Sequence, residues 1–234
     1  MKVEQISEHV WSLRSWLLLQ CRVWVVEEPD GITLIDAGMP FMAKGIVDFL
    51  ERFPAKPVKQ VLLTHGHSDH VGSLRQVLAK RQVPVYAHRE EIPYMEGRLM
   101  YPRRKKAEKN VEPGLAQPLP ENEQGGLDKI GSLQPYFTPG HSPGHVVYYH
   151  EQDRVLLAGD LFTSKRGKLH HPMPLFTADM AEAVRSAWIV TQLQPDHLEV
   201  CHGNPVKQPA ASMEEYMRTT AEKYGIALDI SLLP

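Results

Sequence analysis

Residues 62–72 read LLTHGHSDHVG and carry four side chains that can bind a metal ion, at positions 65, 67, 69 and 70. They follow a run of Val and Leu residues typical of a buried strand. His65 and His67 lie two residues apart just beyond that strand, so an extended backbone points both imidazoles to one side. The chain then turns into a helix, which can direct Asp69 and His70 back toward the same region.

Four ligands are too few for a two-metal site. Zinc takes imidazole nitrogen and carboxylate oxygen at about 2.0–2.2 Å in near-tetrahedral sites, and two ions that share a water need about six or seven protein ligands. Three further candidates each follow a predicted strand: His141 in FTPGHSPGH, Asp160 after VLLAG, and His202 after LEVC. Together the seven residues predict a row of strand-end ligands that converge on one edge of the fold.

Composition excludes several other classes of protein. The 234 residues suffice for a sizeable core, and a net charge of -2 argues against general nucleic-acid binding. No apolar run approaches the roughly 18 residues needed to span a bilayer. The polar start MKVEQISEHVW is not a signal peptide, and two cysteines are too few for a disulfide scaffold. We therefore expect a cytoplasmic protein with a small-molecule substrate and neither a nucleic-acid nor a membrane partner; the oligomeric state is not predicted.

Hydrophobic periodicity predicts alternating strands and helices. Strands are predicted at residues 11–14, 22–28, 31–36, 58–64, 83–87, 136–138, 146–150, 154–158 and 198–201. Helices are predicted at residues 39–53, ending before Pro54, and at 69–80, 179–192 and 212–224. Two similar halves of this kind predict an α+β fold in which two mixed sheets pack face to face with helices outside.

Residues 92–134 fit neither half. They contain a basic cluster at positions 103–106 and then a run rich in Pro and Gly. A solvated loop or helix face is favoured for the basic cluster, and a lid over a cleft is the alternative. We expect one domain over residues 1–234 with an insertion or lid at about 92–134.

The remaining histidines and both cysteines receive simpler interpretations. His145 could orient a neighbouring ligand, and surface positions are predicted for His9, His88, His150 and His197. The His170–His171 pair is assigned to a loop surface, with a place in the substrate cleft as the alternative. Candidate substrate contacts are Phe162, Tyr101 and His171. Neither Cys21 nor Cys201 has the partners of a nucleophile triad.

Four motifs together resemble the metallo-β-lactamase superfamily. They are HGHSDH at 65–70, PGHSPGH at 139–145, GDLF at 159–162 and CHG at 201–203, in the family's order and across nearly the whole chain. The resemblance implies an αββα sandwich with the metals at one edge between the sheets. It also implies that His65, His67 and His141 hold one metal, that Asp69, His70 and His202 hold the other, and that Asp160 bridges them.

The resemblance predicts two divalent ions, with Zn²⁺ favoured over iron or manganese. A hydroxide shared by both ions would attack a carbonyl carbon, and Asp69 would pass a proton to the leaving group. The bridging Asp160 resembles the glyoxalase II and lactonase branches, so we expect an ester, thioester or lactone substrate. Two departures are visible: Thr163 stands where lactonases usually carry tyrosine, and the segment after His202 is too short for the glutathione-binding part of glyoxalase II.

Three alternatives stay open at this stage. A phosphodiesterase or RNA-processing nuclease would use the same two metals, with the basic cluster at 103–106 as its only support. A persulfide-oxidising enzyme would carry a single iron, because imidazole and carboxylate also suit iron. A metal-binding module without catalysis would need a fully closed coordination sphere.

Overall fold

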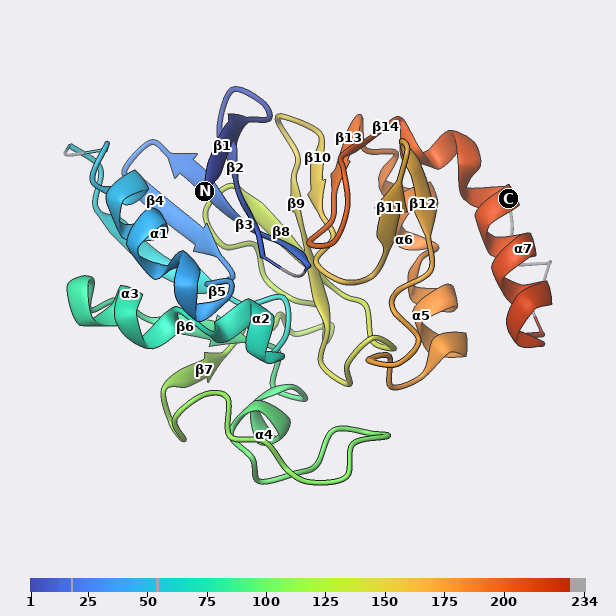
Figure 1. The fold of residues 1–234 in the computed structure, drawn as a ribbon. Coiled ribbons are helices and arrows are strands. Elements are labelled where there is room, and N and C mark those ends of the chain that lie inside the picture. The colour runs from blue at the N-terminus through green and yellow to red at the C-terminus, as the bar shows by residue number, and fades with distance from the viewer. Residues whose placement is uncertain (18, 54, 228–234) are drawn as a thin grey trace.

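Two β-sheets face each other and helices cover their outer sides in the computed structural model, which describes residues 1–17, 19–53 and 55–227 (Figure 1). This arrangement confirms the predicted αββα sandwich. Two predictions reach residues outside these ranges: the end of the first helix before Pro54, and the domain boundary at residue 234. Within the described part of the chain, no helix is long and apolar enough to cross a bilayer.

The first sheet has seven strands in sequence order, β1 to β7. Its first four strands pair antiparallel, and β4 to β7 pair parallel. Because the carboxyl ends of parallel strands meet at one edge, the residues that follow β4 and β5 become neighbours. The strands are β1 Lys2–Gln5, β2 Val10–Trp16, β3 Gln20–Glu28, β4 Gly31–Ile35, β5 Val58–Leu62, β6 Val85–Ala87 and β7 Ala116–Pro118.

The second sheet has five strands in the order β14-β13-β10-β9-β8. Its one parallel pair, β10 with β13, brings Asp160 and His202 to the same edge. The strands are β8 Leu133–Phe137, β9 Val146–His150, β10 Val155–Leu157, β13 His197–Glu199 and β14 Val206–Lys207. A separate hairpin, β11 Thr163–Lys165 with β12 Lys168–His170, lies between the two halves of this sheet in the sequence.

Alternating side chains of β9 explain why two layers of core form. Val146 and Tyr148 pack with the first sheet, whereas Val147 and Tyr149 pack with the helices on the other side. A strand that is buried on both faces is expected to read as a continuous apolar run, as VVYY does. Each fully buried side chain of this size contributes roughly 1.5–3 kcal/mol through the hydrophobic effect.

The helices divide between the two sheets, with α1 to α3 on the first and α5 to α7 on the second (Figure 1). 3₁₀ turns at Pro40–Met42 and Pro209–Ser212 lead into α1 and α7. The helices are α1 Ala43–Leu50, α2 Ser68–Val71, α3 Leu74–Lys80, α4 Ile92–Met95, α5 Met180–Ser186, α6 Ile189–Leu193 and α7 Met213–Tyr224.

Two of the predicted helices are interrupted in the structure. The helix predicted at 69–80 breaks at Gly72–Ser73, because the Ser73 amide donates to the carbonyl of Gly38 and its hydroxyl donates to that of Met39. The helix predicted at 179–192 divides into α5 and α6. Asp179 caps α5, accepting a hydrogen bond from the amide of Glu182 at 3.0 Å.

The segment 92–134 is partly built into the first sheet. Its strand β7 pairs parallel with β6 at the sheet edge, and β8 already begins at Leu133. Arg103 donates to the carbonyls of Pro174 and Thr177, so the basic cluster also contacts the second half of the chain. A lid role for the rest of the segment stays a prediction.

Two of the four predicted surface histidines are buried, so those predictions are wrong. His88 stacks on Phe137 with ring centroids 4.0 Å apart. His150 is the last residue of β9, and its ring stacks on that of His9 with centroids 5.3 Å apart. His9 and His197 are half-buried.

Candidate metal centre

The HGHSDH segment links β5 to α2 and forms one wall of the site. His67 keeps an extended backbone at the start of α2, with φ -67° and ψ 152°, so His65 and His67 still follow the strand direction. Asp69 and His70 lie on the single turn of α2. Glycine is required between the two histidines, because a Cβ at Gly66 would lie 2.2 Å from the Cβ of Met95.

The first group of predicted ligands is a cluster of three buried imidazoles. The distance from His65 Nε2 to His67 Nδ1 is 2.9 Å, and that from His67 Nδ1 to His141 Nε2 is 3.1 Å. Ligands bound at 2.0–2.1 Å around a tetrahedral ion lie about 3.3 Å from one another. The three nitrogens therefore converge at nearly the spacing that one metal ion requires.

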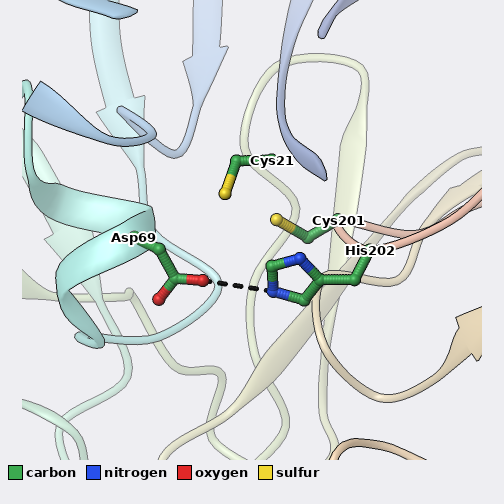
Figure 2. Close-up of side chains that lie close together, drawn as sticks. All are labelled: Cys21, Asp69, Cys201 and His202. Carbon is green, nitrogen blue, oxygen red and sulfur yellow. Dashed lines mark ion pairs between the residues drawn. The ribbon is translucent and has the colours of Figure 1, made fainter. Parts of the chain in front are cut away.

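The second group lies beside the first. His202 Nε2 is 3.1 Å from Asp69 Oδ2, a pair marked in Figure 2, and His70 Nε2 is 3.8 Å from the same oxygen. His70 and His202 are buried, while the side chain of Asp69 keeps 24% of its surface exposed. Asp69 is thus the one predicted ligand that is substantially open to solvent.

Asp160 stands between the two groups. Its Oδ1 lies 3.4 Å from His70 Nε2, and its Oδ2 lies 3.4 Å from His141 Nε2 and 3.3 Å from His202 Nε2. Each group therefore has a nitrogen in contact with this one carboxylate. The structure brings all seven residues together, with Asp160 in contact with both groups.

Three buried atoms at this point have no hydrogen-bond partner within the described residues: His70 Nε2, Asp160 Oδ1 and His202 Nε2. A buried polar atom without a partner costs about 1–3 kcal/mol, and all three lie where a metal ion would satisfy them. Imidazole nitrogen and carboxylate oxygen also suit Zn²⁺. The residues present therefore fit a divalent metal.

The charge state of the site also favours a cation. Burial lowers the pKa of His65 and His141 well below the usual range and that of His67 to about 4, so these rings keep their lone pairs. Burial opposes ionisation of Asp69 as well, yet His70 and His202 together lower its pKa to about 2. Three imidazoles that keep their lone pairs therefore lie beside an ionised carboxylate, whereas the negative groups next to His70 and His202 raise the pKa of these two rings.

Two of the candidate ligands are oriented by hydrogen bonds on the side of the ring away from the site. Asp36 Oδ2 accepts from His70 Nδ1 at 2.7 Å, and the carbonyl of Gln20 accepts from His202 Nδ1 at 2.6 Å. In both rings, Nε2 is left to face the site. Asp36 was missed by sequence reasoning, although it follows the strand GITLI just as Asp160 follows VLLAG.

His145 supports the central carboxylate. Its Nε2 accepts from the amide of Asp160 at 3.1 Å, and its Nδ1 lies 2.9 Å from Thr138 Oγ1. Burial lowers the pKa of His145 to about 3, which keeps Nε2 unprotonated and able to accept. The idea that His145 orients a neighbouring ligand therefore agrees with its contacts.

Glu91 ties the two ligand-bearing loops together and carries no signal in the sequence. Its Oε1 accepts from the amide of Gly66 at 2.8 Å and from the Tyr101 hydroxyl at 2.6 Å. Its Oε2 accepts from the Ser142 hydroxyl and the Gly144 amide, both at 2.8 Å. All four groups donate to one buried carboxylate, so Glu91 holds the HGHSDH loop against the PGHSPGH loop.

The three candidate substrate contacts lie outside the cleft above the ligands. Phe162 is buried in the second core, where its ring centroid lies 5.2 Å from that of Tyr216. Tyr101 is buried beside His67 and directs its hydroxyl to Glu91. His171 lies beside α7, where Lys223 approaches its Nε2 at 2.7 Å. The structure therefore gives Phe162 and Tyr101 packing roles and places His171 elsewhere.

A cleft of about 340 Å³ opens over Asp69 and Asp160. Arg104 and Glu108, from the predicted insertion, line one side of it. Arg104 also lies over the ring of Phe176 at 5.0 Å from its centroid. The other walls are largely apolar and come from Leu17, Leu19, Met39, Phe41, Met173 and Phe176.

The comparisons with known proteins agree with this geometry. A family model described as the metallo-beta-lactamase superfamily matches residues 16–201. The chain is 35% identical over 210 residues to the probable metallo-hydrolase YybB of Bacillus subtilis (strain 168), covering 88% of this chain and 93% of that protein. It is 28% identical over 157 residues to a hydroxyacylglutathione hydrolase of Pseudomonas fluorescens (strain SBW25), covering 65% and 51%.

Solved structures show the same fold at lower sequence identity. A metallo-β-lactamase from Erythrobacter litoralis, with β-mercaptoethanol in its active site, superposes with a TM-score of 0.74 at 18% identity and covers 94% of this chain and 96% of that chain. The mono-zinc form of FIM-1 from Pseudomonas aeruginosa gives 0.72 at 17% identity, covering 97% and 96%.

Proposed function

Because the chain belongs to the metallo-β-lactamase superfamily and is a hydrolase of that family, we propose that it is a dinuclear enzyme acting on an ester, thioester or lactone of a small molecule. The observation that carries the proposal is the position of Asp160 within 3.3–3.4 Å of nitrogens from both ligand groups. One carboxylate between two sets of ligands is the arrangement that a pair of ions needs.

Two bound divalent ions, with zinc as the favoured metal, would supply hydroxide near neutral pH from a shared water and would polarise the substrate carbonyl. The residues of the chain hold the reacting groups in place and transfer the proton. Asp69 lines the cleft, so it is the residue placed to pass a proton from the attacking water to the leaving group.

The cleft favours substrates with an apolar body. Leu17, Leu19 and Phe41 line it, as does Phe176, whose ring lies under Arg104. An acyl or alkyl group would be buried against these side chains, at about 0.8 kcal/mol for each CH₂ group. The hydroxyacylglutathione hydrolases among the relatives support a thioester within this range.

A substrate panel tests the proposal on protein whose metal content has been measured. Lactones, thioesters, phosphodiesters and β-lactams are compared for the wild type, His141→Ala and the control His197→Ala, whose half-buried histidine lies outside the site. We expect turnover of carbonyl esters that His141→Ala abolishes and His197→Ala retains. Turnover of phosphodiesters alone would overturn the proposal and favour the nuclease alternative.

The same measurement decides the non-hydrolytic alternatives. One iron per chain together with oxygen consumption on a persulfide would identify a dioxygenase, and stable metal without turnover of any substrate would identify a binding module. Arg104 is the only side chain of the basic cluster that lines the cleft within the described residues, which is little support for an RNA substrate. A cytoplasmic location stays a prediction.

A further inference from the structure

The proposed hydrolysis does not use the two cysteines of the chain, yet both lie at the edge of the metal centre. Cys21 is the second residue of β3, and Cys201 follows β13, so 180 positions of sequence separate them. Both are buried, with 2% and 0% of their surfaces exposed. Figure 2 shows the two sulfur atoms pointing into the space beside the ion pair of Asp69 and His202.

Four ligand atoms meet in that space. The two Sγ atoms, an Asp69 carboxylate oxygen and a His202 ring nitrogen all lie within 4.8 Å of one another. Around a tetrahedral zinc ion with Zn–S near 2.3 Å, neighbouring ligand atoms lie about 3.3–3.8 Å apart. A spacing of 4.8 Å therefore has to contract by about 1.0–1.5 Å for the four side chains to enclose an ion.

Ordinary core packing is the simpler explanation for a buried cysteine, because such thiols behave as small hydrophobic groups. Two observations argue against it here. His202 Nε2 is buried and faces only carboxylate oxygens, of Asp69 at 3.1 Å and of Asp160 at 3.3 Å, and its Nδ1 donates to the carbonyl of Gln20. The thiol of Cys201 lies 3.8 Å from the carbonyl of Arg22 and also contacts the side chains of Cys21 and His202. Apolar packing does not account for a carboxylate and an imidazole placed against the two thiols.

We propose that Cys21, Asp69, Cys201 and His202 form a sulfur-containing metal site that selects thiophilic divalent ions, such as zinc, cadmium or cobalt, over magnesium and manganese. Two thiolates favour the former ions, whereas oxygen ligands suit the latter. Binding releases the two thiol protons to solvent, and no oxidation occurs.

This site overlaps the predicted second metal position. Asp69 and His202 belong to both, and Cys201 also lies within 4.8 Å of the ligand atoms of His70, Asp160 and His202. One ion can therefore use either the nitrogen and oxygen ligands or the sulfur ligands, but two ions cannot share Asp69 and His202 without distortion. The proposal of a sulfur site rests on these contacts and does not depend on hydrolytic activity.

The test is cobalt binding to reduced, metal-free protein, followed by absorption spectroscopy. Thiolate bound to Co²⁺ gives an intense near-ultraviolet charge-transfer band, whereas nitrogen and oxygen ligands give only weak visible bands. Because the chain has two cysteines in all, this band can arise only from Cys21 and Cys201. We expect it in the wild type, at reduced intensity in Cys21→Ala, and absent in Cys21→Ala/Cys201→Ala, whose visible bands persist.

A wild-type protein that binds Co²⁺ without the charge-transfer band would overturn the proposal. X-ray absorption at the cobalt edge of the wild type gives a second measurement that does not depend on how the variants fold. Sulfur neighbours in the first coordination shell support the site, and a shell of nitrogen and oxygen alone contradicts it. Hydrolysis is measured on the same samples, so failure of the sulfur site is distinguishable from failure of the proposed enzyme.

Discussion

Glu91→Gln is expected to loosen the two ligand-bearing loops although Glu91 itself binds no metal. The substitution keeps the size of the side chain and replaces one of its two acceptor oxygens by an NH₂ group. Each oxygen now accepts one backbone amide and one hydroxyl: Gly66 with Tyr101, and Ser142 with Gly144. A hydroxyl can rotate and accept from the new NH₂ group, but a backbone amide cannot.

The expected loss of stability follows from these four hydrogen bonds. Whichever way the substituted side-chain amide turns, one backbone N–H loses its charged acceptor and faces another donor. A hydrogen bond to a charged group contributes about 1.5–3 kcal/mol, and a buried donor left without a partner costs about 1–3 kcal/mol. Because these terms overlap, we expect Glu91→Gln to lower the free energy of unfolding by about 2–4 kcal/mol.

Urea unfolding of metal-free protein measures this loss, with Glu90→Gln as the matched control. The neighbouring Glu90 keeps 61% of its side chain exposed, so its substitution is expected to change stability by at most about 0.5 kcal/mol. Equal stabilities of Glu91→Gln and Glu90→Gln would refute the assignment of Glu91 as the link between the loops.

Three further predictions concern the metal, the cleft and the pH dependence. Asp36→Asn removes the carboxylate that orients His70 and is expected to weaken zinc binding by about 10–100-fold in competition with a chromophoric chelator; unchanged affinity would contradict it. Phe176→Ser removes an apolar wall and is expected to raise KM for long-chain acyl substrates more than for acetyl substrates; an equal effect on both would count against the apolar cleft. Burial lowers the pKa of His88 to about 4 from its ordinary value of 6.5, so the unfolded chain takes up a proton first and stability falls between pH 6.5 and 4. His88→Phe should reduce that fall in urea unfolding, and an identical pH profile would show that His88 does not cause it.

The sequence predicts that the seven candidate ligands lie close together because each lies in a short motif at a strand end. HGHSDH, PGHSPGH and GDLF carry their own turn residues, so their positions at one edge follow from local pattern and parallel strand order. Asp36 gave the same kind of signal and was overlooked. Glu91 gave none, because its donors lie between 10 and 53 positions away along the chain.

Errors in the predicted fold also arise from contacts between residues that lie far apart in the sequence. The break at Gly72–Ser73 arises from hydrogen bonds to Gly38 and Met39, which lie more than one element away in the sequence. His88 and His150 are buried by neighbouring segments, Phe137 for the one and His9 for the other. Local periodicity predicts which elements form, whereas contacts distant in sequence decide where they break and what they cover.

Stepwise loading of metal-free protein with Zn²⁺ tests the central claim most directly. Hydrolysis of an ester or thioester that the enzyme turns over is recorded after each addition, on protein of known concentration. We expect no turnover without metal and a maximum at about two ions per chain, since Asp160 stands between two complete groups of ligands. Full activity at one ion per chain, or in the metal-free protein, would contradict the dinuclear account.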